Sequence, residues 1–519
     1  MPQLPTLPRT ATLETLQRSR NIAAIATLAS GLESINAELR GLCLRSLLTR
    51  DEDIARRQIV LHWEHYSPVD VELLRQSRSQ FGNLTKQLLA HGSLSEKHMA
   101  LAAIRDLDLH DALEDILEIV VDPAHALCVE ATQCLNQLCN DWGARARAGR
   151  DVPTIRGRML ECLHDQLATF DEHGSLSLLE AWLTVVHWDD AAQRSLIGDP
   201  SHVAYRGVMS LLRGSENPAI VQLLAGYLGR ATTPKSVLNV LVERSDTLLA
   251  LEMAHQSGSG TWQATLKRLQ RLPPLASLKA LQHDMPDVDV EVEHRLWLMI
   301  AASSDDLQQV LRGALLHSQA GGRDARQTAA DMLRLCRRPD LETLVPALQA
   351  AEFESSPSEL SLGVLTRQLA LWLCSPSRVL RKAAREFLQE FTVDRLLTQV
   401  RLWPAQLCRS MASIVTLVES DLPERLTREL QNPAPQRRLA ALQVIELLGC
   451  AQSISQALLP LLNDPRLEVR VRTIDLLAAL GHEALEQLIP ALLADANTDI
   501  QDAANRAARR LQRGKAHTH

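Results

Sequence analysis

Two short clusters of histidine and acidic residues carry the side chains best suited to metal or acid–base chemistry. One reads HWEH at positions 62–65 and the other HWDD at positions 187–190. On a helix His62 and His65 would stand one turn apart, so both imidazoles could face one ion, whereas Glu64 would point elsewhere. Since no third ligand follows nearby, a packing or surface pair is the alternative at both places. We expect no stoichiometric metal and no other cofactor.

The chain lacks the sequence motifs of common active sites. It contains no His-Glu-x-x-His, no Gly-x-Ser-x-Gly, no phosphate-binding glycine-rich loop with lysine and no dinucleotide fingerprint. Its nine cysteines are scattered and form no Cys-x-x-Cys pair, which favours reduced, buried thiols and a cytoplasmic location. We therefore predict that the protein is not an enzyme.

The elements that must position all of these side chains are predicted to be helices in a repeat. The segment from Leu458 to Gly481 reads as a helix, a turn with Asp-Pro, a second helix and a glycine stop. The pattern returns upstream, ending at Gly449, and downstream, ending at Leu511. A unit that recurs about every 31 residues is the signature of a solenoid.

The register of the repeat follows from the residues of its turn and second helix. The turn positions recur at nearly equal spacing, and the sixth position after each holds a long polar side chain: Asn432, Asp464 and Asp495 are followed by Arg438, Arg470 and Gln501. We expect Asp464 to cap the second helix, Pro460 to bend the first, and Gly481 to end the second in a left-handed conformation.

These units resemble HEAT repeats in the turn Asp-Pro, the Val-Arg six residues later and the Leu-Leu-x-x-Leu-Gly ending. The resemblance covers residues 422–511; Arg381 after Ser375-Pro376 shares the spacing, and residues 404–412 match weakly. It implies that turn and second-helix side chains form a ladder between repeats, with members Asp464, Arg470, Asn432 and Arg438. The fold that it implies is all-α, a right-handed α-solenoid of HEAT-like helical hairpins.

The regularity of the pattern predicts four regions along the chain. We expect disordered tails at 1–10 and 513–519, a divergent helical-repeat region at 11–360 and regular HEAT-like repeats at 361–512. The divergence is predicted because the Asp-Pro and Asn-Pro turns between 122 and 218 do not keep the spacing of the C-terminal repeats. The alternating run at 288–293 is interpreted as the acidic start of a helix, with an edge strand as the alternative.

The first charged surface that the sequence predicts is acidic. From Asp106 to Asp122 there are seven acidic residues and no lysine or arginine. Four of them fall at three- and four-residue steps on one helix face, namely Asp111, Glu114, Asp115 and Glu118. They form either a solvated face or a patch for a basic partner.

The second charged surface is basic and lies near the C-terminus. Between positions 366 and 472 there are fifteen Lys or Arg residues against ten Asp or Glu. Because the second helices generally line the concave face of HEAT solenoids, the resemblance implies that four arginines form a ridge for an acidic surface: Arg385, Arg437, Arg472 and Arg509. The alternative is that these are surface or ladder arginines without a ligand.

Eight tryptophans are spread along the chain, and most lie on apolar helical stripes that predict burial. Trp142, beside Asp141 and Gly143, and Trp262, within SGSGTWQ, are less clearly apolar in context. An exposed tryptophan at either place would be a candidate contact for a partner.

Taken together, these features favour a non-catalytic scaffold or adaptor that binds another protein on the surface of the solenoid. The net charge of −7 argues against nucleic acid, although a nucleic-acid-binding solenoid that uses the arginine ridge is the first alternative. A HEAT-like enzyme related to the bilin lyases is the second. No apolar run reaches the roughly 20 residues of a membrane span. Opposite charges in the two halves also make self-association a hypothesis.

Overall fold

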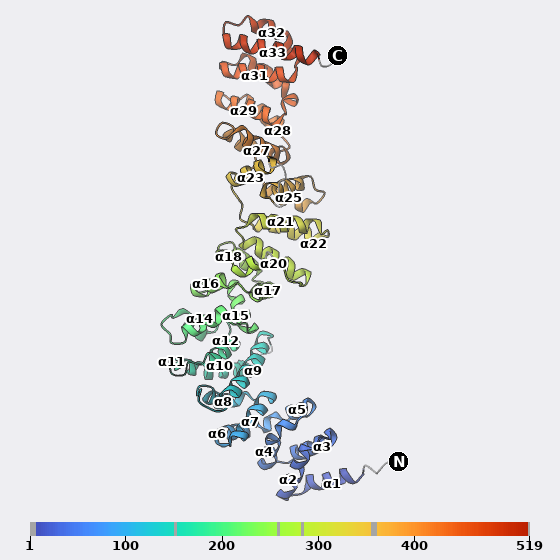
Figure 1. Ribbon diagram of the computed structural model, residues 1–519, viewed down its shortest axis with the longest axis vertical. Helices are drawn as coiled ribbons and strands as arrows, with labels where there is room; N and C mark the ends of the chain where they lie inside the picture. The colour runs from blue at the N-terminus through green and yellow to red at the C-terminus, as the bar shows by residue number, and fades with distance from the viewer. Residues whose placement is uncertain (1–6, 150–152, 257–259, 282–284, 354–360, 517–519) are drawn as a thin grey trace. The chain divides into compact units, whose positions relative to one another are not determined.

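The protein is built from α-helices throughout the part of the chain that the structure describes (Figure 1). This structure is a computed structural model, and it describes residues 7–149, 153–256, 260–281, 285–353 and 361–516. Those residues form 33 α-helices and seven short 3-10 segments and contain no β-strand. The helices pack into two compact units, unit 1 (Met1–Thr261) and unit 2 (Trp262–His519).

Most of unit 1 consists of seven successive helix pairs, which we call hairpins. The first helices of these hairpins are α2 (Ile22–Ser30), α4 (Asp53–Leu61), α6 (Gly82–His91), α8 (Leu113–Val120), α10 (Pro153–Leu167), α14 (Tyr205–Gly214) and α16 (Lys235–Glu243). Their partners, the second helices, are α3 (Ala37–Leu48), α5 (Pro68–Arg75), α7 (Leu94–Leu107), α9 (Cys128–Arg147), α12 (Leu176–Val185), α15 (Pro218–Leu228) and α17 (Thr247–Gln256). Three further helices lie outside this pattern: α1 (Leu7–Arg18), α11 (Phe170–His173) and α13 (Ala191–Gly198).

Each hairpin of unit 1 packs mainly on its neighbours, as in a solenoid. Among the first helices, α4 packs on α2 and α6, and α8 packs on α6 and α10. Among the second helices, α7, α9, α12, α15 and α17 follow one another in contact. The apolar faces of the two rows meet between them, where side chains such as Leu107, Leu135 and Trp182 are fully or almost fully buried.

Side chains in the turns end and begin these helices. Ser67 and Asp70 form a capping box at the start of α5, and Ser93 and Glu96 form another at the start of α7. Each box satisfies backbone amides that a helix leaves without a partner in its first turn. These two caps therefore fix where α5 and α7 start.

The first half of unit 2 has less regular hairpins. Its helices are α18 (Trp262–Leu269), α19 (Ala276–Leu281), α20 (Val290–Ser303), α21 (Leu307–Gln319), α22 (Arg323–Leu335), α23 (Leu341–Phe353), α24 (Leu362–Ala370) and α25 (Arg378–Phe387). The interpretation of 288–293 as a helix start is confirmed, because α20 begins at Val290 directly after Asp289. α25 packs on α22, whereas the chain of contacts to the next repeats passes through α23 and α24.

The second half of unit 2 contains the regular repeats. Its helices are α26 (Val393–Gln399), α27 (Ala405–Val418), α28 (Leu422–Leu430), α29 (Pro435–Leu448), α30 (Ser455–Leu458), α31 (Leu467–Leu480), α32 (Glu483–Leu493) and α33 (Thr498–Ala516). The second helices α27, α29, α31 and α33 pack in a row. The predicted α-solenoid of helical hairpins, regular at the C-terminal end and irregular in the middle, is confirmed.

The signals that end the helices act as expected at Gly481 and more strongly than expected at Pro460. Gly449 and Gly481 end α29 and α31 with φ of +65°, a conformation that suits glycine. Pro460 does more than bend the first helix, because α30 ends at Leu458 and Leu459–Asn463 continues as a 3-10 segment. The missing proline amide removes one helical hydrogen bond, which explains the change of helix type.

The ladder that the HEAT resemblance implied joins consecutive repeats. Arg438 donates to the backbone carbonyls of Asn432 and Pro433 at 2.7 and 3.0 Å, and its Nη2 donates to Asp464 Oδ1 at 2.9 Å. The expectation that Asp464 caps the second helix is wrong, because Arg466 is the N-cap of α31 and no side chain caps that helix; Asp464 instead accepts a hydrogen bond from the Arg466 amide within the turn, at 2.8 Å. Arg438 and Asp464 are both buried, so this arginine links one turn to the next inside the protein.

The same positions recur with weaker contacts in the neighbouring repeats. Arg470 Nη1 lies 4.0 Å from Asp495 Oδ2, and Gln501 donates to the carbonyl of Asp495 at 2.7 Å. Arg381 likewise donates to the carbonyl of Pro376 at 3.0 Å. A polar side chain at the sixth position after the turn therefore returns to its own turn in several repeats.

The described helices reach beyond two of the predicted tail boundaries. α1 already begins at Leu7, inside the tail predicted at 1–10, and residues 1–6 lie outside the described part. α33 continues to Ala516, inside the tail predicted at 513–519, and residues 517–519 are not described. The predicted regions at 11–360 and 361–512 were defined by repeat regularity and stay a prediction. The boundary between the two compact units is a different kind of division, and it follows Thr261 in the chain.

Candidate partner-binding groove

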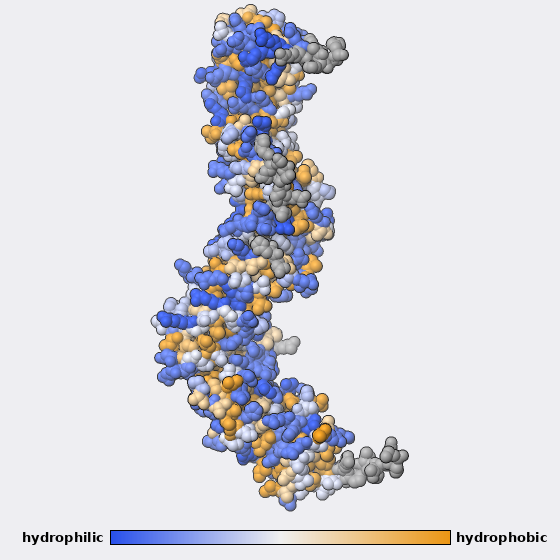
Figure 2. Space-filling model, in the orientation of Figure 1, coloured by the Kyte–Doolittle hydropathy of each residue, from blue (hydrophilic) through white to orange (hydrophobic). Residues whose placement is uncertain are grey.

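A groove of about 620 Å³ crosses the last second helices of unit 2. Its walls come from three neighbouring helices, α29, α31 and α33, which pack side by side. Six of its lining residues are charged and four are apolar: Glu446, Arg472, Asp475, Arg506, Arg509, Arg510, Leu476, Ala478, Ala479 and Ala507. Because the alanines are small, the helices leave a hollow with an apolar floor and a charged rim. Figure 2 shows mostly hydrophilic residues at this end of the chain.

Two ion pairs bridge the helices across the groove. Arg472 on α31 lies 2.7 Å from Glu446 on α29, and Arg506 on α33 lies 3.0 Å from Asp475 on α31. The hydrogen bonds from Arg506 to Asp475 raise the pKa of this guanidinium further above its ordinary value. Both pairs are largely exposed, so each contributes little to stability and mainly fixes the direction of the two arginines.

The two remaining arginines of the groove are exposed and without an ion pair in the described residues. Arg509 and Arg510 lie on α33 next to the buried Ala507. With four arginines and two carboxylates, the groove has two positive charges in excess. Such an excess, held beside an apolar floor, is complementary to a segment that carries both carboxylates and apolar side chains.

The structure brings together two of the four predicted ridge arginines. Arg472 and Arg509 both line the groove. Arg437 lies in the first turn of α29, 3.9 Å from Glu429 on α28, and is not among the lining residues. Arg385 is exposed on α25, which packs on α22 instead of joining the row of second helices. These positions differ because the three C-terminal arginines follow the turns of their repeats at unequal separations, which places them at different heights and faces of a helix.

Sequence reasoning missed the acidic members of the groove. Asp475 and Arg506 occupy the same position relative to the turn residues of their repeats, Asp464 and Asp495. Residues at the same position of neighbouring repeats lie side by side, so opposite charges there predict a bridge between second helices. That comparison of repeat positions could have found this pair.

The predicted acidic face of α8 is partly covered by α10. Arg158 on α10 lies 3.4 Å from Asp111, and the Cys162 thiol lies 3.6 Å from Glu114. Asp115 is half-buried and Glu118 is exposed. Asp111 lies in the 3-10 segment before α8, so α8 itself carries only three of the four carboxylates, and Asp111 and Glu114 already contact side chains of the next repeat.

The HWEH cluster is not arranged as a helical metal site. α4 ends at Leu61, and residues 63–65 form a 3-10 turn, so the expected helical spacing of the two histidines is wrong. The His62 ring contacts the carbonyl of Gln58 at 2.7 Å and Glu33 at 3.4 Å, and its centroid is 6.3 Å from that of His65. Across the described residues, no group of three or more His, Cys, Asp or Glu side chains is placed to hold a metal ion.

The HWDD cluster holds a loop between two helices of unit 1. The Asp190 carboxylate accepts a hydrogen bond from the His187 amide at 2.6 Å and one from Arg156 on α10. His187 contacts Asp189, and the Trp188 ring stacks on the Arg230 guanidinium at 3.3 Å. These side chains connect α10, the loop after α12 and the end of α15, which is a packing role.

Trp142 and Trp262, the two tryptophans in a less apolar sequence context, differ in burial. Trp142 is only 4 % exposed, and its indole N–H donates to Asp108 at 2.7 Å. Trp142 is therefore not an exposed contact for a partner, because it is buried and the aspartate at the end of α7 supplies the partner that its indole needs. Trp262 is half-buried at the start of α18.

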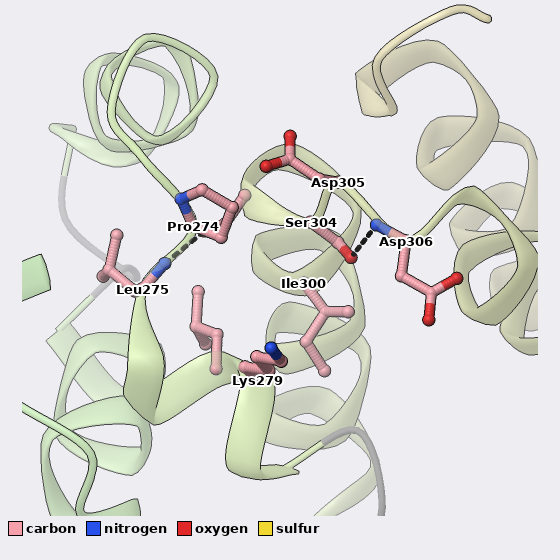
Figure 3. A pocket seen from close by; sticks show the side chains of 9 residues that line it. Pro274, Leu275, Lys279, Ile300, Ser304, Asp305 and Asp306 are labelled. Carbon is pink, nitrogen blue, oxygen red and sulfur yellow. Dashed lines mark hydrogen bonds between the residues drawn. The ribbon is translucent and has the colours of Figure 1, made fainter.

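A second cavity, of about 370 Å³, lies where the start of α19, the end of α20 and the residues just before α21 come together (Figure 3). Ser303 accepts a hydrogen bond from the Leu275 amide, and Ser304 accepts one from the Asp306 amide, each at 3.0 Å. Asp305, at its rim, pairs with Arg337. Since these polar groups are already engaged in the protein's own loops, the cavity offers few groups that converge on a ligand.

The buried cysteines are poorly suited to nucleophilic chemistry. Burial raises the pKa of Cys134 and of Cys336 to about 12, and it raises the pKa of Cys139 as well. All nine cysteines are free thiols. A thiol with a raised pKa forms little of the reactive thiolate at neutral pH.

None of the described helices combines the length and the apolar character needed to cross a membrane. The longest described helix of unit 1, α9, illustrates why, because glutamate, aspartate and arginine occur along its 20 residues.

Comparison with known proteins finds similarity in structure but not in sequence. No family model and no curated protein matches the chain. Among solved structures, the chain is similar to the one described as Uso1-2, with 11% identity, a TM-score of 0.29 and coverage of 93% of this chain and 87% of that one. It is also similar to a microtubule polymerase with an array of tumor overexpressed gene domains, with 12% identity, a TM-score of 0.22 and coverage of 92% and 99%.

A third similar structure comes from the Kap95:Nup1 complex, with 11% identity, a TM-score of 0.24 and coverage of 97% of this chain and 73% of that one. These neighbours are HEAT and armadillo repeat proteins. Such low scores concern fold alone, and the fold is established independently by the packed hairpins and by the ladder at Arg438. The described part of the chain is an α-solenoid of packed helical hairpins.

Proposed function

We propose that the protein is a non-catalytic scaffold that binds another protein through the groove on α29, α31 and α33. The observation that carries this proposal is the excess of arginine over carboxylate around an apolar floor, with Arg509 and Arg510 exposed and without an ion pair in the described residues. A repeat surface of this kind supplies area for a partner instead of a reaction centre.

The chemistry of the groove favours an acidic polypeptide segment as its ligand. Carboxylates can form paired hydrogen bonds with guanidinium groups, and small apolar side chains can cover the alanines. A nucleic acid is less suitable because Glu446 and Asp475 stand among the arginines and the net charge of the chain is −7. We therefore place the acidic protein segment first and a nucleic acid second.

A second copy of this chain is an alternative partner for the groove. The exposed Glu118 and the other carboxylates of the α8 face, Asp111, Glu114 and Asp115, offer the opposite charge. An association of this kind weakens as salt screens the charges. Light scattering at low and high ionic strength tests it, and a monomer whose mass does not depend on salt argues against self-association.

The proposal is tested by reversing the two free charges of the groove. We expect the full-length Arg509→Glu/Arg510→Glu variant to lose a partner that the wild-type protein captures from a lysate, as identified by mass spectrometry. The matched control is Arg323→Glu, which changes an exposed arginine of unit 2 on α22. It should retain the partner.

Two results would contradict the proposed function. If the double variant captures the same proteins as the wild type, the groove is not the binding surface. If the wild type instead retards a DNA or RNA duplex in a gel-shift assay with strong dependence on salt, the nucleic-acid alternative replaces the proposal. Arg385→Glu shows in the gel-shift assay whether α25 contributes to the surface that binds nucleic acid.

A further inference from the structure

The connections between the first and second helices of unit 1 carry exposed apolar residues at corresponding places. In each of the first five hairpins, an aliphatic side chain within two residues of the start of the second helix is more than half exposed. They are Ile35 at 100 %, Val69 at 78 %, Leu94 at 55 %, Val129 at 66 % and Leu176 at 51 %. Each connection together with the first residues of the second helix forms one segment, and we call the five segments, residues 31–38, 62–72, 92–97, 121–130 and 168–176, the turn edge.

Capping does not explain these residues. In a hydrophobic staple, the apolar residue before the cap packs against a residue in the next turn and is thereby covered. Val69, Leu94 and Val129 instead lie within the first turn of their helices and remain open to solvent. Single exposed apolar residues are ordinary, but recurrence at one structural position in consecutive repeats is typical of a contact surface.

Contacts between neighbouring hairpins show that these connections follow one another along unit 1. Glu33 in the first connection lies 3.4 Å from His62 in the second, and Arg40 on α3 lies 2.8 Å from Asp70 on α5. Farther along, α5 packs on α7, α7 on α9 and α9 on α12. The second helices from α5 to α12 are therefore neighbours along unit 1, and side-chain contacts tie the first connection to the second.

A groove of about 300 Å³ opens beside this edge between the 63–66 turn and helices α5, α7 and α9. Its apolar lining includes Val71, Leu101 and Ala102, and its rim includes Glu64 and Glu130. Neither of these glutamates has an ion pair in the described residues, whereas Asp106 in the same groove pairs with Arg105. The groove thus has two negative charges in excess next to Val129 and one helical turn from Leu94.

The charge of the whole turn edge has the same sign. Its five segments contain a single lysine or arginine, which is Lys97. They contain ten acidic residues: Glu33, Glu38, Glu64, Asp70, Glu72, Glu96, Asp122, Glu130, Asp171 and Glu172. Four of the acidic residues are engaged by His62, Arg40, Arg75 and Arg57. The other six have no ion pair among the residues that the structure describes. An anionic membrane surface or a nucleic acid would be repelled here.

We propose that the turn edge and its groove bind an extended polypeptide segment that carries an apolar side chain at every third position and basic side chains between them. The exposed aliphatic residues would contact the apolar side chains, and Glu64 and Glu130 would pair with lysine or arginine. Adjacent helices stand roughly 8–10 Å apart, and a chain in the polyproline II conformation advances about 3.1 Å per residue with three residues per turn, so an apolar side chain at every third position lies on one face and matches the repeat.

This proposal is tested on the full chain with a fluorescein-labelled 18-residue peptide of Leu-Lys-Ser repeats, followed by fluorescence anisotropy. Two control peptides have glutamate in place of lysine, or serine in place of leucine. We expect binding of the first peptide and at least tenfold weaker binding of both controls, because each control removes one of the two complementary features.

Variants locate the binding surface. We expect Val69→Ser/Leu94→Ser/Val129→Ser and, separately, Glu64→Gln/Glu130→Gln to weaken binding of the Leu-Lys-Ser peptide at least tenfold. The matched control, Leu371→Ser/Leu402→Ser, alters two exposed apolar residues of unit 2 and should bind like the wild type. All five substituted positions of the test variants are exposed or half-buried, and circular dichroism confirms that each variant keeps its helices.

Either of two outcomes overturns the proposal. The first is that the wild type does not bind the Leu-Lys-Ser peptide. The second is that the variants of the turn edge bind it as tightly as the wild type does. Because Arg509→Glu/Arg510→Glu leaves the turn edge unchanged, that variant should still bind the peptide, and the test is independent of the groove in unit 2.

Discussion

At the scale of single residues, Arg438 joins the turn of one repeat to the turn of the next. Its guanidinium and the Asp464 carboxylate are buried, with side-chain exposed fractions of 10 % and 4 %. Replacing one member of a buried pair leaves the other charge without compensation, which costs roughly 3–5 kcal/mol. We expect Arg438→Met to lower the free energy of unfolding by about 3 kcal/mol, measured by urea denaturation followed by circular dichroism.

The neighbouring residue supplies the control for this prediction. Arg437→Met alters an exposed arginine of the same turn and should change the free energy of unfolding by less than about 0.5 kcal/mol. In the double variant Arg438→Met/Asp464→Leu, both charges are absent, and most of the lost stability should return. Equal stability of Arg438→Met and the wild type would contradict the role of Arg438 in the ladder.

Residue types predicted the ladder better than the groove, and the reason is physical. The positions of Asn432, Arg438 and Asp464 follow from a turn whose geometry is fixed by backbone hydrogen bonds, so their relation survives in the sequence. Arg472 and Arg509 line the same groove only because α31 and α33 pack at a particular height relative to each other. That height depends on how alanine and leucine side chains fit across the interface, which spacing along one chain does not reveal.

At the scale of elements, α9 and α12 approach so closely that one position allows only glycine. A Cβ added at Gly143 would lie 2.3 Å from the carbonyl oxygen of Thr184 and 3.1 Å from its carbon. We expect Gly143→Ala to force the helices apart and to lower the free energy of unfolding by about 2 kcal/mol. Chemical denaturation of the full chain provides the measurement.

Gly157 on the adjacent α10 is the matched control for this substitution. A Cβ there would meet no atom within 4 Å, so Gly157→Ala gains the higher helix propensity of alanine without a clash. This variant should be more stable than the wild type by roughly 0.5–1 kcal/mol. If Gly143→Ala were stabilising in the same way, α9 and α12 could not be in close contact.

The kinds of element were predictable from sequence, but their interruptions were less so. Apolar periodicity and the Asp-Pro turns indicated helical hairpins, and the hairpins are present. The break at Pro460 exceeds the bend that was expected, because the residues after it adopt 3-10 geometry up to Asn463. The displacement of α25 onto α22 could not be read from Arg381, whose spacing from its turn is that of a regular repeat.

At the scale of the whole molecule, each of the two units has its own apolar interior. In unit 2 a connected cluster of buried side chains extends from Ala301 to Leu511. We expect fragments 1–261 and 262–519, expressed separately, to be helical and to unfold cooperatively, because most contacts of each hairpin lie within its unit. Circular dichroism and calorimetry of the two fragments provide the check.

A cut inside unit 1 is the control, because it shows whether the chain folds equally well when it is divided at any loop. Division after Gly174 separates α9 from α12 and exposes the surface where Gly143 meets Thr184. Those fragments should be less stable than fragments 1–261 and 262–519. The division into units is wrong if either fragment of the boundary cut is unfolded while the fragments of the internal cut are folded.

The bridges between repeats also bear on how the chain responds to tension. Arg438 to Asp464, Glu446 to Arg472 and Asp475 to Arg506 each tie one hairpin to its neighbour. When the two ends of a solenoid are pulled, hairpins detach one after another instead of all together. Because only the tie of Arg438 to Asp464 is buried among these three, we expect the two hairpins that it joins to separate at a higher force than the hairpins joined by the exposed pair of Asp475 and Arg506.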